Sequence, residues 1–415
     1  MQRILFSIIL SPLLFFLPSE LQAQFNCDSS RFLLEVFDSV EVSKRIHYGL
    51  NRDSLFMDLY EPKGDTMSER PLLVLAFGGS FVFGNRDDSY MVELGTTFAK
   101  MGYVVVSIDY RLTGTLIVNP SDANFYNAVI KATHDMRACV RYFRKDIIEN
   151  GNSFRINSDL IYAGGVSAGG IAAIHLGYLN DLSEFPPELD TTGIGGIEGL
   201  SGNPGFSSEV AGIINYCGAI GDSSWINAGE VPMISMHGNN DAVIPYSSGR
   251  VVVFNANLAV DGSASMNIKM ANEGIENPFL TWDGAGHTPF LTGFSSTPGL
   301  YMDSLFNFSS SVLYGWICDY YNTATTIEPS LAAEVQVRVF PNPATEFIQI
   351  EWDRFRSPKL EVGLYTINGQ ALSITQEDYG NGLRIYRESL PPGYYLISME
   401  DPESRRKFYQ NVLLR

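Results

Sequence analysis

The amino-acid sequence predicts an α/β domain with a doubly wound, mostly parallel sheet, followed by a small antiparallel β-sandwich. Continuous apolar runs, such as 72–77 and 103–108, alternate with segments of helical periodicity up to about residue 321. Buried parallel strands have this continuous apolar character, and strand–helix alternation favours helices on both faces of the sheet. Beyond residue 334 the segments become short and alternating, without helical stretches, which is typical of a β-sandwich.

The elements of the first unit follow in chain order. Strands are predicted at 56–60, 72–77, 103–108, 160–166, 211–217, 231–237 and 279–282. Helices are predicted at 90–101, 123–143, 168–179 and 302–321. The second of these helices carries Asp135, Arg137 and Arg141 on or near its predicted polar side. Residues 251–260 alternate like a hairpin strand, and the Gly-, Pro- and Ser-rich segment 180–208 is expected to form an elaborated loop or a small lid.

Strands of the second unit are expected to be short and separated by Gly and Pro turns. They are predicted at 335–340, 347–352, 361–365, 383–386, 394–399 and 407–414.

Length and charge narrow the classes of protein that fit. A chain of 415 residues exceeds one average domain. Its formal net charge is −18, and the tail from Glu334 holds 11 acids and 10 bases, so the first 333 residues carry −17. Such a surface repels phosphate backbones and anionic membranes. Nucleic acid is therefore not an expected partner.

The N-terminus has the pattern of a signal peptide at 1–23. Arg3 is followed by an apolar run from Ile4 to Leu17, and Ala23 supplies a small residue at the cleavage point. A membrane anchor and a lipoprotein are the alternatives, but the run is short for a span and Cys27 lacks the small residues that precede a lipidated cysteine. We expect no integral membrane segment. The predicted divisions are a domain at 24–322, a linker at 323–333 and a second domain at 334–415.

Four cysteines permit disulfides in an exported chain. Cys139 and Cys217 fall in helical and strand patterns and can be buried apolar residues. Cys27 and Cys318 flank the first domain, and a bridge between them would join its two ends.

The segment Gly165-Val166-Ser167-Ala168-Gly169 fits the pattern G-x-S-x-G. A predicted strand ends at Val166 and a predicted helix begins at Ala168, which is the sharp strand-to-helix turn that exposes a nucleophilic serine. The start of a helix also adds positive potential where an oxyanion forms. The alternative is a glycine-rich turn with an incidental serine. We predict that Ser167 is the nucleophile.

A serine hydroxyl needs a base to take its proton. The chain has five histidines: His47, His134, His175, His237 and His287. We assign His287, because a loop after the last core strand can reach back to the serine. His237, at the end of strand 231–237, is the alternative. Two of the others lie inside predicted helices, and His47 precedes the predicted sheet.

The third member of such a site is an acid that orients the imidazole. Asp241 lies in the loop after strand 231–237, which places it between Ser167 and His287 in chain order. Asp283 is only four residues from His287, too close to align its ring from a separate loop, and Asp222 is a weaker alternative. We predict the triad Ser167, Asp241 and His287, which needs no metal ion and no organic cofactor.

Residues 40–321 resemble the α/β-hydrolase superfamily in its carboxylesterase and lipase-like branch. The resemblance rests on the elbow around Ser167 and on Gly78-Gly79-Ser80-Phe81, which is similar to the family's H-G-G-G/S-F loop. It implies an oxyanion hole built from the N–H groups of Gly79, Ser80 and Ala168. Phe77 stands where the family usually has histidine, which removes a polar side chain that braces the loop. The segment Asp109-Tyr110-Arg111-Leu112 resembles a family motif that we interpret as structural.

The tail resembles the type A C-terminal sorting domain of the type IX secretion system. The similar segments are Val339-Phe340-Pro341-Asn342-Pro343-Ala344, Leu364-Tyr365 with Asn368-Gly369, and Leu390-Pro391-Pro392-Gly393-Tyr394-Tyr395-Leu396. The resemblance implies an exported protein, secreted or attached to the cell surface, with the type IX machinery as its partner. A glycan-binding β-sandwich is the alternative.

These observations favour a secreted serine hydrolase that cleaves carboxylic esters, small or linked to polysaccharide. A peptidase of the prolyl-oligopeptidase branch is one alternative, although no room exists for its usual N-terminal propeller before Phe37. A non-catalytic binding protein on a hydrolase fold is the other. Trp225 follows a central strand and is expected to line the substrate pocket or to belong to the core.

Overall fold

The structure of the chain is a computed structural model, and it covers most of both predicted units. It describes residues 27, 30–49, 55–114, 118–119, 121–187, 189, 192–253, 256–324, 337–340, 344–352, 360–366, 371–379, 382–387, 390–400 and 407–414. The predicted signal peptide at 1–23 and most of the predicted linker at 323–333 lie outside these residues. Among the described helices, none combines the length and the apolar character that a membrane span requires.

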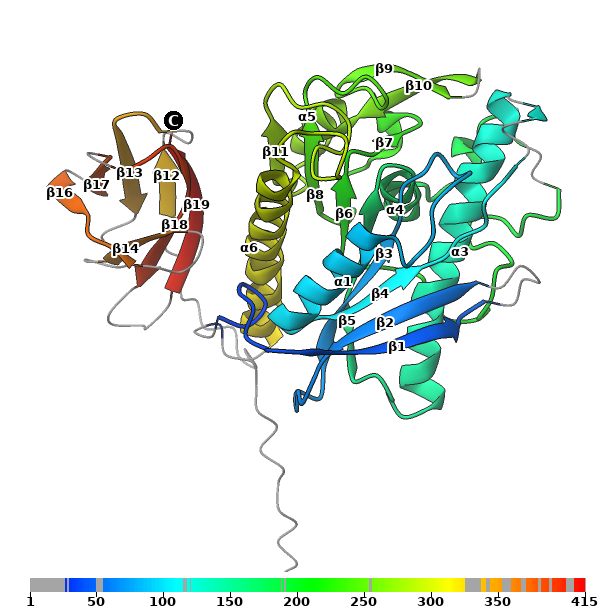
Figure 1. Ribbon diagram of the computed structural model, residues 1–415, viewed down its shortest axis with the longest axis horizontal. Coiled ribbons are helices and arrows are strands. Elements are labelled where there is room, and N and C mark those ends of the chain that lie inside the picture. Colours follow the sequence, from blue (N-terminus) through cyan, green and yellow to red (C-terminus); the bar gives the residue numbers. More distant parts are fainter. Residues whose placement is uncertain are drawn as a thin grey trace, which may run out of the picture.

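The first unit is built on an eight-stranded sheet (Figure 1). Its strands, in their order across the sheet, are β1 (Val40–His47), β2 (Phe56–Pro62), β4 (Val104–Ile108), β3 (Arg70–Ala76), β5 (Ile156–Val166), β6 (Gly212–Tyr216), β8 (Met233–Gly238) and β11 (Phe279–Trp282). The pairs β1–β2 and β2–β4 are antiparallel and all the other pairs are parallel. The predicted fold class is confirmed. The expectation that His47 precedes the sheet is wrong, because it ends the edge strand β1.

Helices cover both faces of this sheet, as Figure 1 shows. The helices α1 (Ser89–Met101) and α6 (Pro298–Ala324) contact each other, and α3 (Asp122–Glu149) packs against α4 (Ala168–Tyr178). A further helix, α5 (Ser263–Asn272), follows a small sheet made of β7 (Ala219–Ile220), β10 (Ala256–Gly262) and β9 (Ser248–Val253). The predicted hairpin around 251–260 is the antiparallel pair β9–β10.

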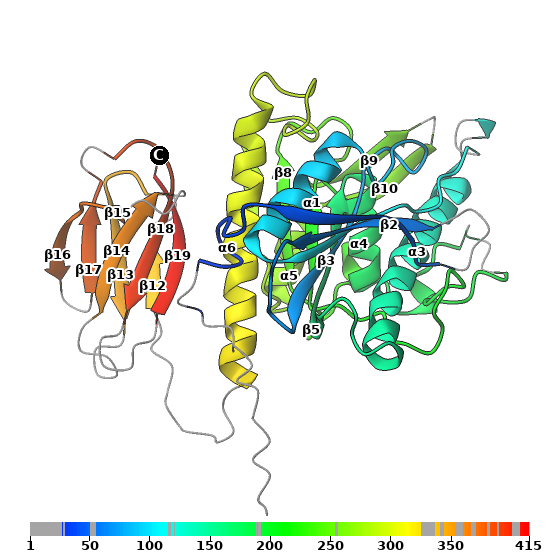
Figure 2. The same ribbon diagram turned by 60° about the horizontal axis from the view of Figure 1, so that its bottom comes forward.

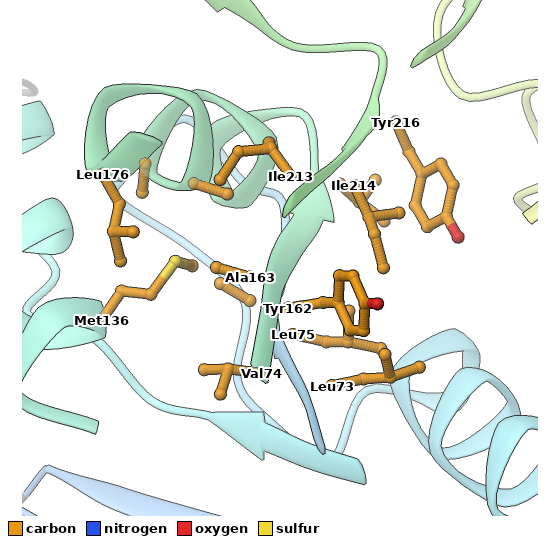
Figure 3. Packing of buried hydrophobic residues seen from close by; sticks show 14 of the residues in the cluster. Leu73, Val74, Leu75, Met136, Tyr162, Ala163, Leu176, Ile213, Ile214 and Tyr216 are labelled. Atoms are coloured by element: carbon orange, nitrogen blue, oxygen red, sulfur yellow. The ribbon is translucent and has the colours of Figure 1, made fainter. Parts of the chain in front are cut away.

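The core lies between the sheet and its helices, and neighbouring residues of one strand point to opposite sides. In Figure 3, Val74 of β3 and Ala163 of β5 point toward Met136 of α3, whereas Leu73 and Tyr162 point the other way. All five side chains are fully or almost fully buried. This two-sided burial explains the continuous apolar runs of the central strands.

The polar side predicted for helix α3 is not exposed, which corrects the sequence-based expectation. Arg137 and Arg141 are buried and bind the carboxylate of Glu198 at 3.2 Å and 2.6 Å. Asp135, which is also buried, accepts a hydrogen bond of 2.6 Å from the hydroxyl of Ser201. The described part of the segment 180–208 is therefore tied to α3 by ion pairs between the exposed Glu198 and two buried arginines, and by the hydrogen bond from Ser201 to Asp135.

A disulfide joins Cys27 to Cys318 of α6, as the sequence suggested. Among the described residues, Cys139 and Cys217 are free and buried. The bridge links positions 291 residues apart and so ties the start of the first unit to its last helix.

The tail forms two four-stranded sheets (Figure 2), and all of their strand pairs are antiparallel. Their strands are β12 (Val337–Phe340), β13 (Phe347–Trp352), β17 (Gly382–Tyr386) and β16 (Thr375–Tyr379) in one sheet, and β15 (Ala371–Leu372), β14 (Glu361–Thr366), β18 (Gly393–Glu400) and β19 (Lys407–Leu414) in the other. Ile350 and Ile385 from the first sheet share a buried cluster with Ile397 and Val412 from the second. The two sheets therefore form one sandwich.

Candidate active site

Ser167 stands on a sharp turn between β5 and α4. Its φ is +53°, a left-handed backbone conformation that costs free energy in a residue other than glycine. Glycines on both sides make the turn sterically feasible, since a Cβ at Gly165 or Gly169 would lie 2.5 Å or 2.1 Å from the carbonyl oxygen of Ala76. The turn therefore packs directly against β3 and holds the serine at the carboxyl end of the sheet.

Two loops bring a histidine and an acid to this serine. His287, after β11, places Nε2 at 2.9 Å from Ser167 Oγ. Its other ring nitrogen, Nδ1, lies 2.6 Å from Oδ2 of Asp241, which follows β8. The structure thus brings the three predicted residues into one hydrogen-bonded chain. In this arrangement His287 can take a proton from the serine while Asp241 holds its ring.

The acids that competed with Asp241 in the sequence have other partners. Asp283 accepts a hydrogen bond of 2.8 Å from Asn239 Nδ2. Asp222 caps a short 3₁₀ turn by accepting from the N–H of Ser224 at 2.8 Å. His237, the alternative base, binds Asp241 from a second direction.

The carboxylate of Asp241 is buried and ionised. Burial by itself would raise its pKa, but hydrogen bonds from His237 and His287 outweigh that effect and hold the pKa well below the ordinary value. Its other oxygen accepts the N–H groups of Val243 at 2.7 Å and Ile244 at 2.9 Å. A negative charge is therefore fixed behind the ring of His287.

One group of side chains in the described part of the chain has the spacing of metal ligands. It consists of Cys217, Asp241 and His287, whose ligand atoms lie within 4.8 Å of one another. Two of these residues already bind each other, and burial raises the pKa of the Cys217 thiol to about 12. These contacts leave the triad residues arranged for proton transfer.

The loop after β3 has the conformation of an anion-binding turn. Gly79, Ser80 and Phe81 have φ values of +127°, +56° and +62°. In the part of the chain that the structure describes, the N–H groups of Gly79, Ser80 and Ala168 donate to no other group. A tight turn whose successive backbone N–H groups have no partner within the chain can bind an anion.

Two tyrosines brace this loop next to Phe77. The hydroxyl of Tyr90, on α1, accepts the N–H of Gly78 at 2.9 Å. The hydroxyl of Tyr110 donates to the carbonyl of Phe77 at 3.0 Å, and the two rings stack with centroids 4.4 Å apart. The sequence indicated a structural role for the motif at 109–112 but carried no signal for Tyr90, whose role depends on how α1 packs.

An apolar pocket lies between α3, α4 and the hairpin β9–β10. Trp225 lines it together with Ile171, His175 and Leu258. Ile171 is one helical turn from Ser167, since its N–H donates to the Ser167 carbonyl at 2.8 Å. Trp225 is partly buried, lines this pocket and also packs against the hydrophobic core, so it combines the two roles that the sequence left open.

Comparison with known proteins supports the fold seen in the structure. Residues 57–201 match the family model BD-FAE. Among solved structures, a truncated carbohydrate esterase from gut microbiota aligns with a TM-score of 0.50 at 17% identity, covering 66% of this chain and 96% of that one. The main domain has the α/β-hydrolase fold. Esterase 2 from the planctomycete Thermogutta terrifontis, with propionate bound, aligns at 19% identity with a TM-score of 0.44, covering 71% of this chain and 97% of that one. No curated protein matches the chain.

The tail of the chain matches a second family model. Residues 338–410 match the secretion system C-terminal sorting domain. The type IX sorting domain expected from the motif at 339–344 is thereby confirmed.

Proposed function

We propose that this α/β-hydrolase is an exported serine esterase that cleaves carboxylic esters through an acyl-enzyme. The hydrogen-bonded chain from Ser167 Oγ through His287 to Asp241, with distances of 2.9 Å and 2.6 Å, carries the proposal. A serine hydroxyl becomes nucleophilic when a base takes its proton, and this geometry supplies the base.

In the first half-reaction, Ser167 Oγ attacks the ester carbonyl carbon and its proton passes to His287 Nε2. The carbonyl oxygen becomes an oxyanion, which the N–H groups of Gly79, Ser80 and Ala168 stabilise. The intermediate collapses, the carbon–oxygen bond of the ester breaks, and the alcohol leaves with the proton from His287. Water then repeats these steps on the acyl-enzyme and releases the carboxylic acid.

We propose that the chain has four parts, with the bounds expected from the sequence. Residues 1–23 are the signal peptide, 24–322 the catalytic domain, 323–333 the linker and 334–415 the sorting domain. A type IX sorting domain directs export, so the esterase acts outside the cell, secreted or attached to the surface. We propose polysaccharide-linked or short-chain acyl esters as its substrates.

Replacement of the nucleophile tests the proposal. The Ser167→Ala protein should lose turnover of short nitrophenyl acyl esters, by a factor of about 10⁴ or more. Ser183, an exposed residue of the 3₁₀ turn Leu182–Glu184, provides a matched control, because Ser183→Ala removes a hydroxyl without touching the triad. Equal turnover in both variants would refute the assignment. Faster cleavage of prolyl peptides than of esters by the wild type would instead favour the peptidase alternative.

A further inference from the structure

His237 binds the same carboxylate oxygen as His287, from the other side. Its Nε2 lies 3.1 Å from Asp241 Oδ2, and His287 Nδ1 lies 2.6 Å from that atom. The side chains of His237 and Asp241 are both fully buried. His237 is the penultimate residue of β8, which lies between β6 and β11 in the sheet, whereas Asp241 sits in the loop that follows. The contact therefore connects the acid of the proposed triad to the sheet.

The tautomer of His237 follows from the groups behind it. The N–H of Gly218 donates to Asn215 Oδ1 at 2.7 Å, so the amide nitrogen of Asn215 faces the other way. That nitrogen donates to the hydroxyl of Ser263 at 2.9 Å. The hydroxyl hydrogen of Ser263 is then available for His237 Nδ1, which lies 2.8 Å away. This arrangement favours a neutral ring in which Nδ1 accepts from Ser263 and the proton is on Nε2.

The opposite tautomer would be unfavourable at this position. Nε2 faces Asp241 Oδ2 at 3.1 Å and the carbonyl oxygen of Ile244 at 3.2 Å, and both atoms are acceptors. Without a proton, Nε2 would place its lone pair against both of them. A buried lone pair facing two acceptors costs free energy. The chain Asn215–Ser263–His237 thus directs one N–H at the acid.

We propose that His237 is a positioning residue, which donates from Nε2 to Asp241 Oδ2 and holds that oxygen where His287 Nδ1 meets it. This inference rests on the proposed esterase function. Three other donors bind the carboxylate: the N–H groups of Val243 and Ile244 at Oδ1, and His287 at Oδ2. Of the two donors on Oδ2, only His237 lies on a strand of the sheet. Without it, the loop alone determines where Oδ2 points.

Steady-state kinetics of full-length variants test this role. His237→Leu removes the donor, and kcat for a short nitrophenyl ester should fall about 10- to 100-fold, the range seen when partners that orient a reacting group are lost. KM should stay within about twofold, because His237 does not touch substrate. His237→Gln places an amide donor near the original Nε2, and it should recover most of the lost kcat. Equal losses in the Leu and Gln variants would show that only packing is involved and would overturn the inference.

A second variant keeps the test decisive if His237→Leu does not fold. Ser263→Ala leaves the imidazole in place but removes the hydroxyl that holds its tautomer, and kcat should fall about threefold to tenfold at constant KM. The far-downfield proton resonance of the His287–Asp241 hydrogen bond should shift in both variants. An unchanged kcat and resonance in folded Ser263→Ala would contradict the proposal.

Control variants separate this inference from the esterase function itself. His134 is also a buried histidine, but it lies on α3, and His134→Gln should leave kcat unchanged. Loss of turnover in Ser167→Ala together with wild-type kcat in His237→Leu would refute only the role of His237. Full turnover in Ser167→Ala would refute the esterase mechanism instead.

Discussion

Substitution of Gly79 by alanine tests whether the loop after β3 supplies the oxyanion donors. An added Cβ would lie 2.2 Å from the carbonyl oxygen and 2.8 Å from the carbonyl carbon of Phe83. These are backbone atoms of the same turn, which the N–H groups of Val82 and Phe83 close by donating to the Gly79 carbonyl at 3.0 Å. The clash can be relieved only if the turn opens.

The size of the effect follows from this geometry. A carbon–oxygen contact needs more than 3 Å, so the loop must shift by about 1 Å, and a displacement of that size costs about 100-fold in rate. Loss of one oxyanion donor costs about 10²- to 10³-fold, which corresponds to about 3–4 kcal/mol. We therefore expect kcat/KM of Gly79→Ala to fall at least 100-fold.

The assay compares kcat/KM for a short nitrophenyl ester in Gly79→Ala and in a matched glycine variant. Gly229 also has positive φ, +88°, but a Cβ there would meet nothing within 4 Å. Gly229→Ala therefore carries the backbone strain without the clash. If both variants kept wild-type kcat/KM while folded, as judged by circular dichroism, the loop would not act as the oxyanion hole.

Three further predictions follow from the site. Asp241→Asn removes the negative charge behind His287, and the amide can hold the His287 ring in the wrong tautomer, so kcat should fall by a factor of about 10⁴. A loss of less than tenfold would contradict the assignment of Asp241 as the acid. Tyr90→Phe removes the acceptor of the Gly78 N–H and should lower kcat about fivefold to tenfold at constant KM, whereas an unchanged kcat would mean that Tyr110 alone braces the loop. Burial lowers the pKa of His175 to about 4 from its unfolded value near 6.5, so unfolding takes up a proton between these values. The contribution of the neutral His175 to the free energy of unfolding is fully present above pH 6.5 and is lost as pH falls toward 4, and the loss amounts to about 2 kcal/mol at pH 5. Urea unfolding of His175→Gln should show a weaker pH dependence, and identical slopes for both proteins would refute that role.

The elements that the sequence predicted are those whose burial leaves a simple pattern. Strands β3 and β4 are buried on both faces and appear as continuous apolar runs. Strand β1 was missed, because its side chains are mostly exposed and Lys44 interrupts the alternation of Val40, Val42 and Ile46 with polar residues. The polar residues of α3 were expected to face solvent, but Glu198 compensates the buried charges of Arg137 and Arg141. A partner 57 or more positions away cannot be inferred from helical periodicity.

Parts of the candidate site were predictable for a related reason. The turn at Ser167 has a local signature, and the order of Asp241 and His287 follows from parallel strands that end at the same edge of the sheet. The braces at Tyr90 and Tyr110 depend on tertiary contacts of the loop after β3. The sequence contained only a weak indication that His237 lies behind Asp241, namely that the two residues are four apart across the end of β8. Which of the two histidines, His237 or His287, faces the serine depends on the loop at 283–288.

Covalent labelling with a fluorophosphonate, followed by mass-spectrometric mapping of the modified peptide, tests the central claim most directly. We expect one adduct, on Ser167. It should form at the same rate as esterase turnover is lost, and it should be absent from Ser167→Ala. Labelling should slow strongly in His287→Ala, because the hydroxyl then has no base within 2.9 Å. The assignment of Ser167 as the nucleophile would be contradicted if an active wild-type protein stayed unlabelled at Ser167. It would also be contradicted if inactivation followed the formation of an adduct on another residue.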